Sequence, residues 1–213
     1  MRHAGPDSVS FAVKGKPQRL RCFLAVPLSE PAIGAAQRLL GELRERVPAT
    51  RWARPESLHV TVHFFGEVEE GAALHGVELV APAARGTQDF DVDLDRLGSF
   101  PAHGAPRVLW LGPAGDIAPL RSLALQCRAV LGEGGFEVES RPYNAHCTLG
   151  RPRSPWTQEA RSAWAAAVAE RRTPMRFTAT RLVLYESRAA AGGAIYTERA
   201  ELPFASGSRV EMP

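Results

Sequence analysis

Two short segments hold the residues of this chain that could carry out acid–base chemistry. His59-Val60-Thr61 recurs as His146-Cys147-Thr148 at a separation of 87 residues (146 − 59). Each lies in a stretch of β-branched and apolar residues that ends in glycine, Gly66 or Gly150, which is typical of a strand. Because side chains alternate between the two faces of a strand, the imidazole and the hydroxyl of each segment share a face. Each strand therefore presents a histidine and a threonine to a cleft and an apolar back to a core.

The same alternation sorts the other residues of the two segments. It places on the apolar back Val60, Val62, Phe64, Ala145, Cys147 and Leu149. It places His63 on the cleft face with His59. Because His63 has no counterpart in the second segment, where Gly150 stands, we expect it to lie at the periphery of the site.

Two imidazoles and two hydroxyls around one cleft suit a phosphoester. One histidine would act as general base and the other as general acid, while threonine hydroxyls and backbone amides hold the non-bridging oxygens. A single histidine on a strand is more often structural than catalytic, so the interpretation depends on the repeat. Packing of the two copies about an approximate twofold axis would bring both segments to the same cleft.

A zinc site is the main alternative, because His59 and His63 have the i, i+4 spacing of helical zinc ligands. On a strand these residues lie about 13 Å apart, which is too far for them to share one ion. Neither segment contains Asp or Glu, and the acidic stretch 89–95 alternates like a solvated edge strand. We therefore expect no metal and no cofactor.

The composition describes an ordinary globular protein. The 213 residues are 45% hydrophobic and 23% charged, enough for one large domain or two small lobes. A net charge of +3 means that any nucleic-acid role depends on a local basic patch. The three cysteines, Cys22, Cys127 and Cys147, have no C-x-x-C spacing, so we expect buried thiols in a reducing cytoplasm.

The ends of the chain do not resemble targeting signals. Residues 1–18 lack a long apolar core and contain turn-forming residues, which predicts a disordered leader. No apolar run approaches the roughly 20 residues that span a bilayer. We expect a domain over 19–203 and a flexible tail over 204–213.

The periodicity predicts two copies of the order strand, helix, histidine strand, helix, strand. The first copy, 19–100, opens with a strand over Arg19–Pro27 in which Arg21 and Phe23 share a face. The second copy covers 106–203. The other predicted elements are helices over 30–47, 69–84 and 158–171, a helix whose apolar stripe runs from Leu120 to Leu131 and which ends at Gly134-Gly135, and strands over 90–97, 107–112, 176–187 and 195–202, the last two joined at Gly192-Gly193.

Several further residues could contact a ligand. Arg151 ends the second segment and could hold an anion with its planar guanidinium. Phe23, Tyr143 and Trp110 are candidates for stacking on a nucleobase. Arg21, on the same face as Phe23, strengthens the case for Phe23.

The two histidine segments resemble the signature motifs of the two-histidine phosphoesterase superfamily. Together with RCFLAVPL, RVLWLG and LVLYESR, the segments SLHVTVHFFGEV and RPYNAHCTLGR are similar to the RNA 2′,3′-cyclic phosphodiesterases long labelled 2′-5′ RNA ligases. The resemblance covers about 19–202. Each motif alone is common by chance, but their order and spacing are specific.

This resemblance implies an α+β, bilobal fold in which duplicated antiparallel sheets line a central groove and helices pack outside. It implies hydrolysis of RNA ends or nucleotides bearing a 2′,3′-cyclic phosphate. Separately from the resemblance, we expect the protein to be cytoplasmic and monomeric. By motif position it makes His59 and His146 catalytic, makes Thr61 and Thr148 ligands of the phosphate, and makes Arg151 a substrate contact.

The chain departs from the family pattern at two places. Asn144-Ala145 replace the proline commonly found before the second histidine, and His63 stands where relatives often have lysine. Two other functions remain open. One is ligation of tRNA halves through a 2′-5′ bond at the same site, and the other is a nucleotide-binding or RNA-end-binding module with little turnover.

Overall fold

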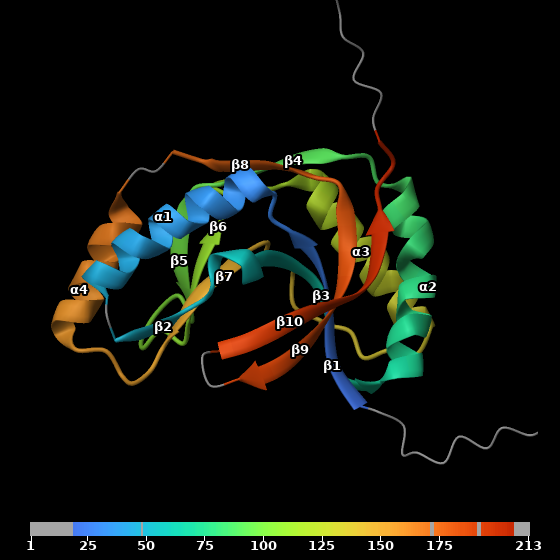
Figure 1. Cartoon of the computed structure of the whole chain (residues 1–213), viewed down its shortest axis with the longest axis horizontal. Coiled ribbons are helices and arrows are strands. Elements are labelled where there is room, and N and C mark those ends of the chain that lie inside the picture. The colour runs from blue at the N-terminus through green and yellow to red at the C-terminus, as the bar shows by residue number, and fades with distance from the viewer. Residues whose placement is uncertain (1–18, 48, 171–172, 191–192, 207–213) are drawn as a thin grey trace, which may run out of the picture.

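The computed structural model describes residues 19–47, 49–170, 173–190 and 193–206 (Figure 1). The predicted leader, the residues of the predicted tail from 207 on, and Gly192 of the predicted turn lie outside this part. The helices are α1 (Glu30–Arg46), α2 (Glu70–Gly86), α3 (Ala118–Glu133) and α4 (Gln158–Ala169), with a 3₁₀ turn, η1 (Pro55–Ser57). The strands are β1 (Arg19–Pro27), β2 (Thr50–Trp52), β3 (His59–Glu69), β4 (Phe90–Leu94), β5 (Arg96–Phe100), β6 (Val108–Gly112), β7 (Cys147–Pro152), β8 (Met175–Ala179), β9 (Arg181–Ala190) and β10 (Gly193–Pro203).

One antiparallel sheet of eight strands forms the framework. Its order is β10-β9-β1-β3-β7-β6-β5, with β2 also paired to β7, and β4 and β8 form a separate two-stranded sheet. Helices α2 and α3 pack together against β3, while α1 and α4 pack together near β2, β5 and β8 (Figure 1). The fold is therefore α+β, with antiparallel sheets and helices outside them, as expected.

The two halves of the sequence exchange strands. β5 comes from the first half but pairs with β6 of the second half. β9 comes from the second half but pairs with β1 of the first, and β10 extends the sheet beyond β9. Neither of the repeats 19–100 and 106–203 thus contains its own complete sheet.

Two predicted strands are each divided in the structure. The stretch 90–97 breaks at Asp95 into β4 and β5, and the stretch 176–187 breaks at Thr180 into β8 and β9. At both places the chain passes from the small sheet to the large one. At each break the apolar alternation shifts by one residue, from Leu94 to Leu97 and from Ala179 to Leu182, so two polar residues stand together where the chain changes sheet.

The fold also extends beyond the predicted start of the tail. Phe204 is buried and stacks on Phe90 with ring centroids 5.7 Å apart. Ala205 forms a parallel bridge with Gln88. Residues 204–205 are therefore part of the packed structure, which corrects the prediction of a flexible tail from 204 on.

Helix α1 shows how the apolar stripes of the sequence are used. Ser29 occupies the N-cap position but its side chain makes no capping hydrogen bond, and Pro31 lies in the first turn, where its missing N–H costs nothing. The face with Ala36, Leu40 and Leu43 is buried.

All three cysteines are free and buried. No helix in the described residues is long and apolar enough to cross a membrane.

Candidate active site

The two histidine segments meet where β3 and β7 join. The pair that the described strands form there is Val60 with Cys147, the middle residues of the two segments. Both are buried, so the flanking histidines and threonines face the opposite side, as the alternation predicts. The local twofold relation between the segments passes through this pair.

The register of this pair sets the arrangement of the four polar residues. Antiparallel pairing places His59 opposite Thr148 and His146 opposite Thr61. The two histidines are then diagonal neighbours, whose Cα atoms typically lie about 7–8 Å apart. A phosphate group is of the right size to lie between two imidazoles that approach from such positions.

Backbone carbonyls fix the tautomers of both histidines. Nδ1 of His59 lies 2.9 Å from the carbonyl oxygen of Ser57, and Nδ1 of His146 lies 2.9 Å from that of Asn144. A carbonyl oxygen only accepts, so each Nδ1 must carry a hydrogen and donate it. In both residues Nε2 is therefore the nitrogen that gains or loses a proton.

Both imidazoles favour the neutral form in the free protein. Burial lowers the pKa of His59 to about 4, against a rise from the Ser57 carbonyl, and the nearby His146 lowers it further. Burial also lowers the pKa of His146, and the cationic Arg151 adds to this effect. A bound anion between the two rings would act in the opposite direction and favour a protonated histidine.

Strand β3 contains two bulge residues relative to β1, and they change the side-chain faces predicted for the residues after Thr61. Against β1, the pairing skips Val62 and then Phe65, so each is a bulge residue. One extra residue reverses the alternation. His63 therefore points into the core and is only 7% exposed, whereas Phe64 faces the cleft side and is 45% exposed.

The predictions for His63 and Phe64 were therefore wrong. His63 packs edge-on against Phe65 with ring centroids 4.8 Å apart. Its pKa is lowered to about 4, mainly by burial and also by Arg128. No hydrogen-bond partner within the described residues reaches its Nε2. His63 is a buried neutral residue behind the site.

A bulge in β7 turns Arg151 toward the site. Leu109 pairs with Gly150 and Trp110 pairs with Thr148, so Leu149 is an extra residue in β7. Uninterrupted alternation would have turned Arg151 toward the core, and the bulge places it on the face of Thr148 instead.

Among the described residues, no carboxylate neutralises the charge of Arg151. It is exposed, and no described carboxylate forms an ion pair with it. In the sheet it lies opposite another exposed arginine, Arg51 of β2. Burial raises the pKa of the Tyr196 hydroxyl, while Arg151, Arg21 and Arg54 act to lower it. Several arginines therefore make this side of the site suitable for an anion.

Phe23 supports His59 rather than offering an open face. It is 3% exposed and stacks on the His59 ring at a centroid distance of 4.6 Å. Tyr196 contacts both rings edge-on, at 5.1 Å from each. Phe23 is therefore too enclosed to stack on a nucleobase, which corrects its predicted role. As predicted, Arg21 shares its face and lies 4.7 Å from the Phe64 ring centroid.

Tyr143 links the two histidine segments. Its hydroxyl donates a hydrogen bond of 3.0 Å to the backbone carbonyl of Thr61. It also packs on the core and lines a cavity next to His146. The residue thus ties the backbone that precedes His146 to the first segment, a role that the sequence did not suggest.

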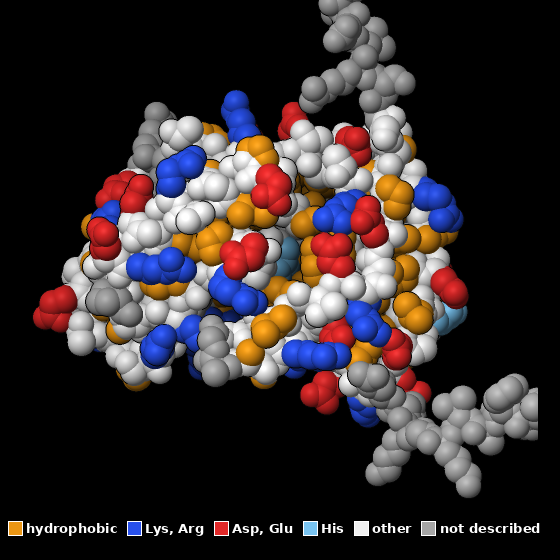
Figure 2. All heavy atoms as spheres, in the orientation of Figure 1, with side chains coloured by type: hydrophobic (Ala, Val, Ile, Leu, Met, Phe, Trp, Pro, Cys, Tyr) orange, Lys and Arg blue, Asp and Glu red, His pale blue; other side chains and the backbone are white. Residues whose placement is uncertain are grey.

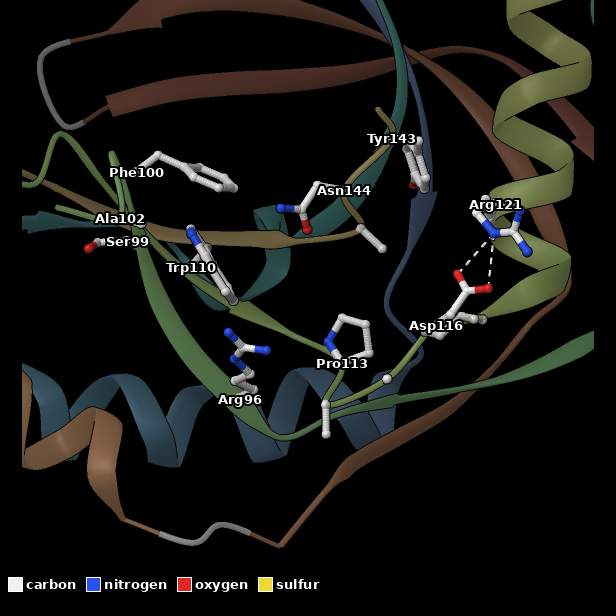
Figure 3. A pocket seen from close by; sticks show the side chains of 14 residues that line it. Arg96, Ser99, Phe100, Ala102, Trp110, Pro113, Asp116, Arg121, Tyr143 and Asn144 are labelled. Atoms are coloured by element: carbon white, nitrogen blue, oxygen red, sulfur yellow. Dashed lines mark hydrogen bonds and ion pairs between the residues drawn. The ribbon is translucent and has the colours of Figure 1, made fainter. Parts of the chain in front are cut away.

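Cavities of unequal size lie beside the two histidines. One of about 170 Å³ adjoins His59 and is lined by Arg54, Tyr185 and Tyr196 among others. The other, of about 500 Å³, adjoins the backbone that precedes His146 (Figure 3). Figure 2 shows a histidine side chain inside a hollow near the centre of one face, with acidic and basic side chains around it.

Comparison with known proteins agrees with this arrangement. Residues 29–191 match the family model of the 2′-5′ RNA ligase superfamily. The chain belongs to this superfamily. Relatives named RNA 2′,3′-cyclic phosphodiesterase include one from Geobacillus stearothermophilus, 32% identical over 67% of this chain and 44% of the relative. Another, from Methanothermobacter thermautotrophicus, is 33% identical over 64% of this chain and 73% of the relative. The match to the first thus spans less than half of that protein.

Solved structures share the fold of this superfamily member. TT0787 of Thermus thermophilus is 26% identical, with a TM-score of 0.69 over 86% of this chain and 97% of its own. E. coli LigT complexed with 3′-AMP is 24% identical, with a TM-score of 0.70 over 88% of this chain and 99% of its own. At 24% identity, the similarity to LigT shows only that the two proteins share a fold.

Sequence reasoning missed the tyrosines that surround the first histidine of this superfamily site. Tyr185 stacks on Phe23 at 5.4 Å, and its hydroxyl donates to Glu198 at 3.2 Å. Tyr185 and Tyr196 come from β9 and β10, which reach the site only through pairing with β1. Alternation could have assigned the two tyrosines to a face of their strands but could not have predicted that they lie beside His59.

The described residues contain no group of three His, Cys, Asp or Glu side chains that could hold a metal ion.

Proposed function

We propose that this protein hydrolyses RNA terminal 2′,3′-cyclic phosphates to 2′-phosphates by general acid–base catalysis. The observation that carries the proposal is the pairing of Val60 with Cys147, which sets two imidazoles and two hydroxyls on one face. The free Nε2 of each histidine supplies the group that such a reaction needs. The names of the relatives in the superfamily support the same substrate.

The reaction needs the two histidines in opposite protonation states. A neutral histidine removes a proton from water, and the water oxygen bonds to phosphorus while the bond from phosphorus to O3′ breaks. The other histidine, protonated, donates its proton to O3′. The products are a 2′-phosphate and a free 3′-hydroxyl, and the two histidines have exchanged states.

The other residues of the face hold the phosphate. The hydroxyls of Thr61 and Thr148 donate to the non-bridging oxygens, where negative charge increases in the transition state. Arg151 adds a guanidinium that can donate two parallel hydrogen bonds to such oxygens. Because the phosphate is anionic, its binding raises the pKa of the histidine that must be protonated.

We propose that the reaction proceeds without a metal ion, since the two imidazoles move both protons and the five-membered ring is already strained. The test is turnover of an oligonucleotide that ends in a 2′,3′-cyclic phosphate, with and without a chelator. A 2′-phosphate product at an equal rate in chelator is expected. A 3′-phosphate product, or a loss of rate that a divalent ion restores, would contradict the proposal.

The same assay separates the alternative functions. In ligation, the activity in the superfamily's description, an RNA 5′-hydroxyl would take the place of water at the same phosphorus atom. Adding a second RNA with a free 5′-hydroxyl would then give a joined product without nucleotide triphosphate. A protein that only binds RNA ends would retain the cyclic substrate unchanged. A monomeric state in the cytoplasm remains our expectation, which sedimentation and cell fractionation can test.

A further inference from the structure

The larger cavity beside His146 has an aromatic floor made by Trp110. Its ring lies against β5 so closely that a Cβ atom on Gly98 would come within 2.2 Å of it. Phe100 lies 5.4 Å from the Trp110 ring and meets the His146 ring edge-on at 5.0 Å. The two aromatic rings thus lead directly from the catalytic histidine into a space of about 500 Å³.

Polar groups that have no partner among the described residues surround this floor. Trp110 is only 9% exposed, and no hydrogen-bond acceptor in the described part of the chain reaches its indole Nε1. Arg96 lines the cavity and forms no ion pair with any described carboxylate. The amide of Asn144 lines it as well, with no hydrogen bond to another described group. In contrast, Asp116 is occupied by Arg121, with contacts of 2.9 and 3.1 Å (Figure 3).

We propose that this cavity binds the base of the terminal nucleotide and selects guanine. The inference builds on the proposed function, which places the cyclic phosphate next to His146. A flat base can stack on the half-buried ring of Phe100, which lies beside Trp110, a contact that any base can make. The volume lies in the range of pockets that hold small ligands. The smaller cavity beside His59, about 170 Å³, leaves less room.

The polar groups decide between the bases. Arg96 offers only donors, and an arginine pairs with the acceptors O6 and N7 of guanine through two hydrogen bonds. Figure 3 shows Arg96 and Asn144 approaching the space beside Trp110 from different sides. The amide oxygen of Asn144 can therefore accept from N1–H and N2–H on another edge of the same base. Adenine offers Arg96 a donor at N6 where guanine has an acceptor, and pyrimidines leave part of the space empty.

The first experiment compares kcat/KM for the 2′,3′-cyclic phosphates of guanosine, adenosine, cytidine and uridine. We expect guanosine to be preferred by about tenfold or more, the effect of one two-bond pairing to a base. The Arg96→Gln variant should reduce the ratio of guanosine to adenosine turnover toward one. Arg85→Gln, the same charge change on α2 outside the cavity, should leave the ratio and the rates as they are. Equal turnover of all four wild-type substrates, or an unchanged ratio in Arg96→Gln, would overturn the proposal.

A second experiment observes the cavity without turnover. The indole N–H signal of Trp110 in a ¹H–¹⁵N spectrum, assigned with Trp110→Phe, should shift when guanosine 2′-phosphate is added and shift less with adenosine 2′-phosphate. The same titration of Arg96→Gln should remove this difference. If no cyclic nucleotide is hydrolysed but the indole signal still responds to guanosine 2′-phosphate, the proposed reaction fails while the base site stands. An indole signal that ignores both nucleotides would reject the base site.

Discussion

His59 and His146 each directly precede one member of the Val60–Cys147 pair, but their surroundings differ. His59 is packed by Phe23, Tyr185 and Tyr196 and adjoins the smaller cavity. His146 meets the edge of Phe100 and adjoins the larger one. The two halves therefore share the histidine pair and its backbone hydrogen bonds, and they differ in the side chains and the space beside each histidine.

The sheet explains this difference. On the first side it continues from β1 through β9 to β10, and these two strands bring tyrosines over Phe23. On the second side it ends at β5, where Gly98 accepts the ring of Trp110 and adds no side chain of its own. One more strand fills the first side, and a glycine on the last strand leaves the second side open.

The largest expected effect tests whether the two histidines are equivalent in the reaction. His59→Ala and His146→Ala should each lower kcat by about 10²-fold or more, since a group of this kind typically contributes about 10²–10⁴. Circular dichroism and thermal unfolding would check that the variants fold. Near-normal turnover in either folded variant would show that the pair does not act as base and acid.

The next prediction tests whether Arg151 lowers the pKa of His146, an influence that His59 does not share. The profile of kcat/KM against pH should be a bell, because one histidine must be neutral and the other protonated. Arg151 lowers the pKa of His146, so Arg151→Ala should raise it and move one limb of the bell to higher pH. If the alkaline limb moves, His146 is the acid, and if the acid limb moves, it is the base. A profile in which neither limb moves would show that Arg151 does not act on His146.

A smaller effect concerns the two threonines, which the register makes equivalent. Thr61→Val and Thr148→Val should each reduce kcat by less than the histidine variants do, because each removes one donor among several. Similar losses in the two variants are expected from the symmetric pairing. A loss confined to Thr148→Val would show that the phosphate lies on the His146 side rather than between the two strands.

The smallest effect on activity is expected behind the site, at His63. A histidine whose folded pKa is lowered adds stability that is complete above its unfolded pKa of about 6.5 and is lost as the pH falls toward its folded pKa of about 4. His63→Leu should therefore gain stability relative to wild type between pH 7 and pH 5, on the order of 1 kcal/mol. Urea unfolding at the two pH values measures this gain, and turnover should stay unchanged. An equal pH dependence in both proteins would contradict the buried neutral state.

The sequence alone placed the two histidines and the two threonines on one face, because period-two alternation holds on both sides of Val60 and Cys147. It failed at His63 and Phe64, because the bulge at Val62 reverses the side-chain faces up to the second bulge at Phe65, and neither bulge leaves a mark in the apolar pattern. The tyrosines of β9 and β10 were missed for a different reason. Their place beside His59 depends on pairing between strands far apart in the chain, which local periodicity does not encode.

The exchange of β5 and β9 between the halves has a consequence for how the site comes into being. Strands that are far apart in the sequence lose chain entropy when they come together, before favourable contacts between them can form. Such pairings therefore slow folding. Half of this chain, folded by itself, would leave β1 or β6 without one of its two neighbouring strands and would hold only one of the two site histidines. The proposed activity therefore depends on the completed topology, because only the whole fold brings both histidines to one sheet.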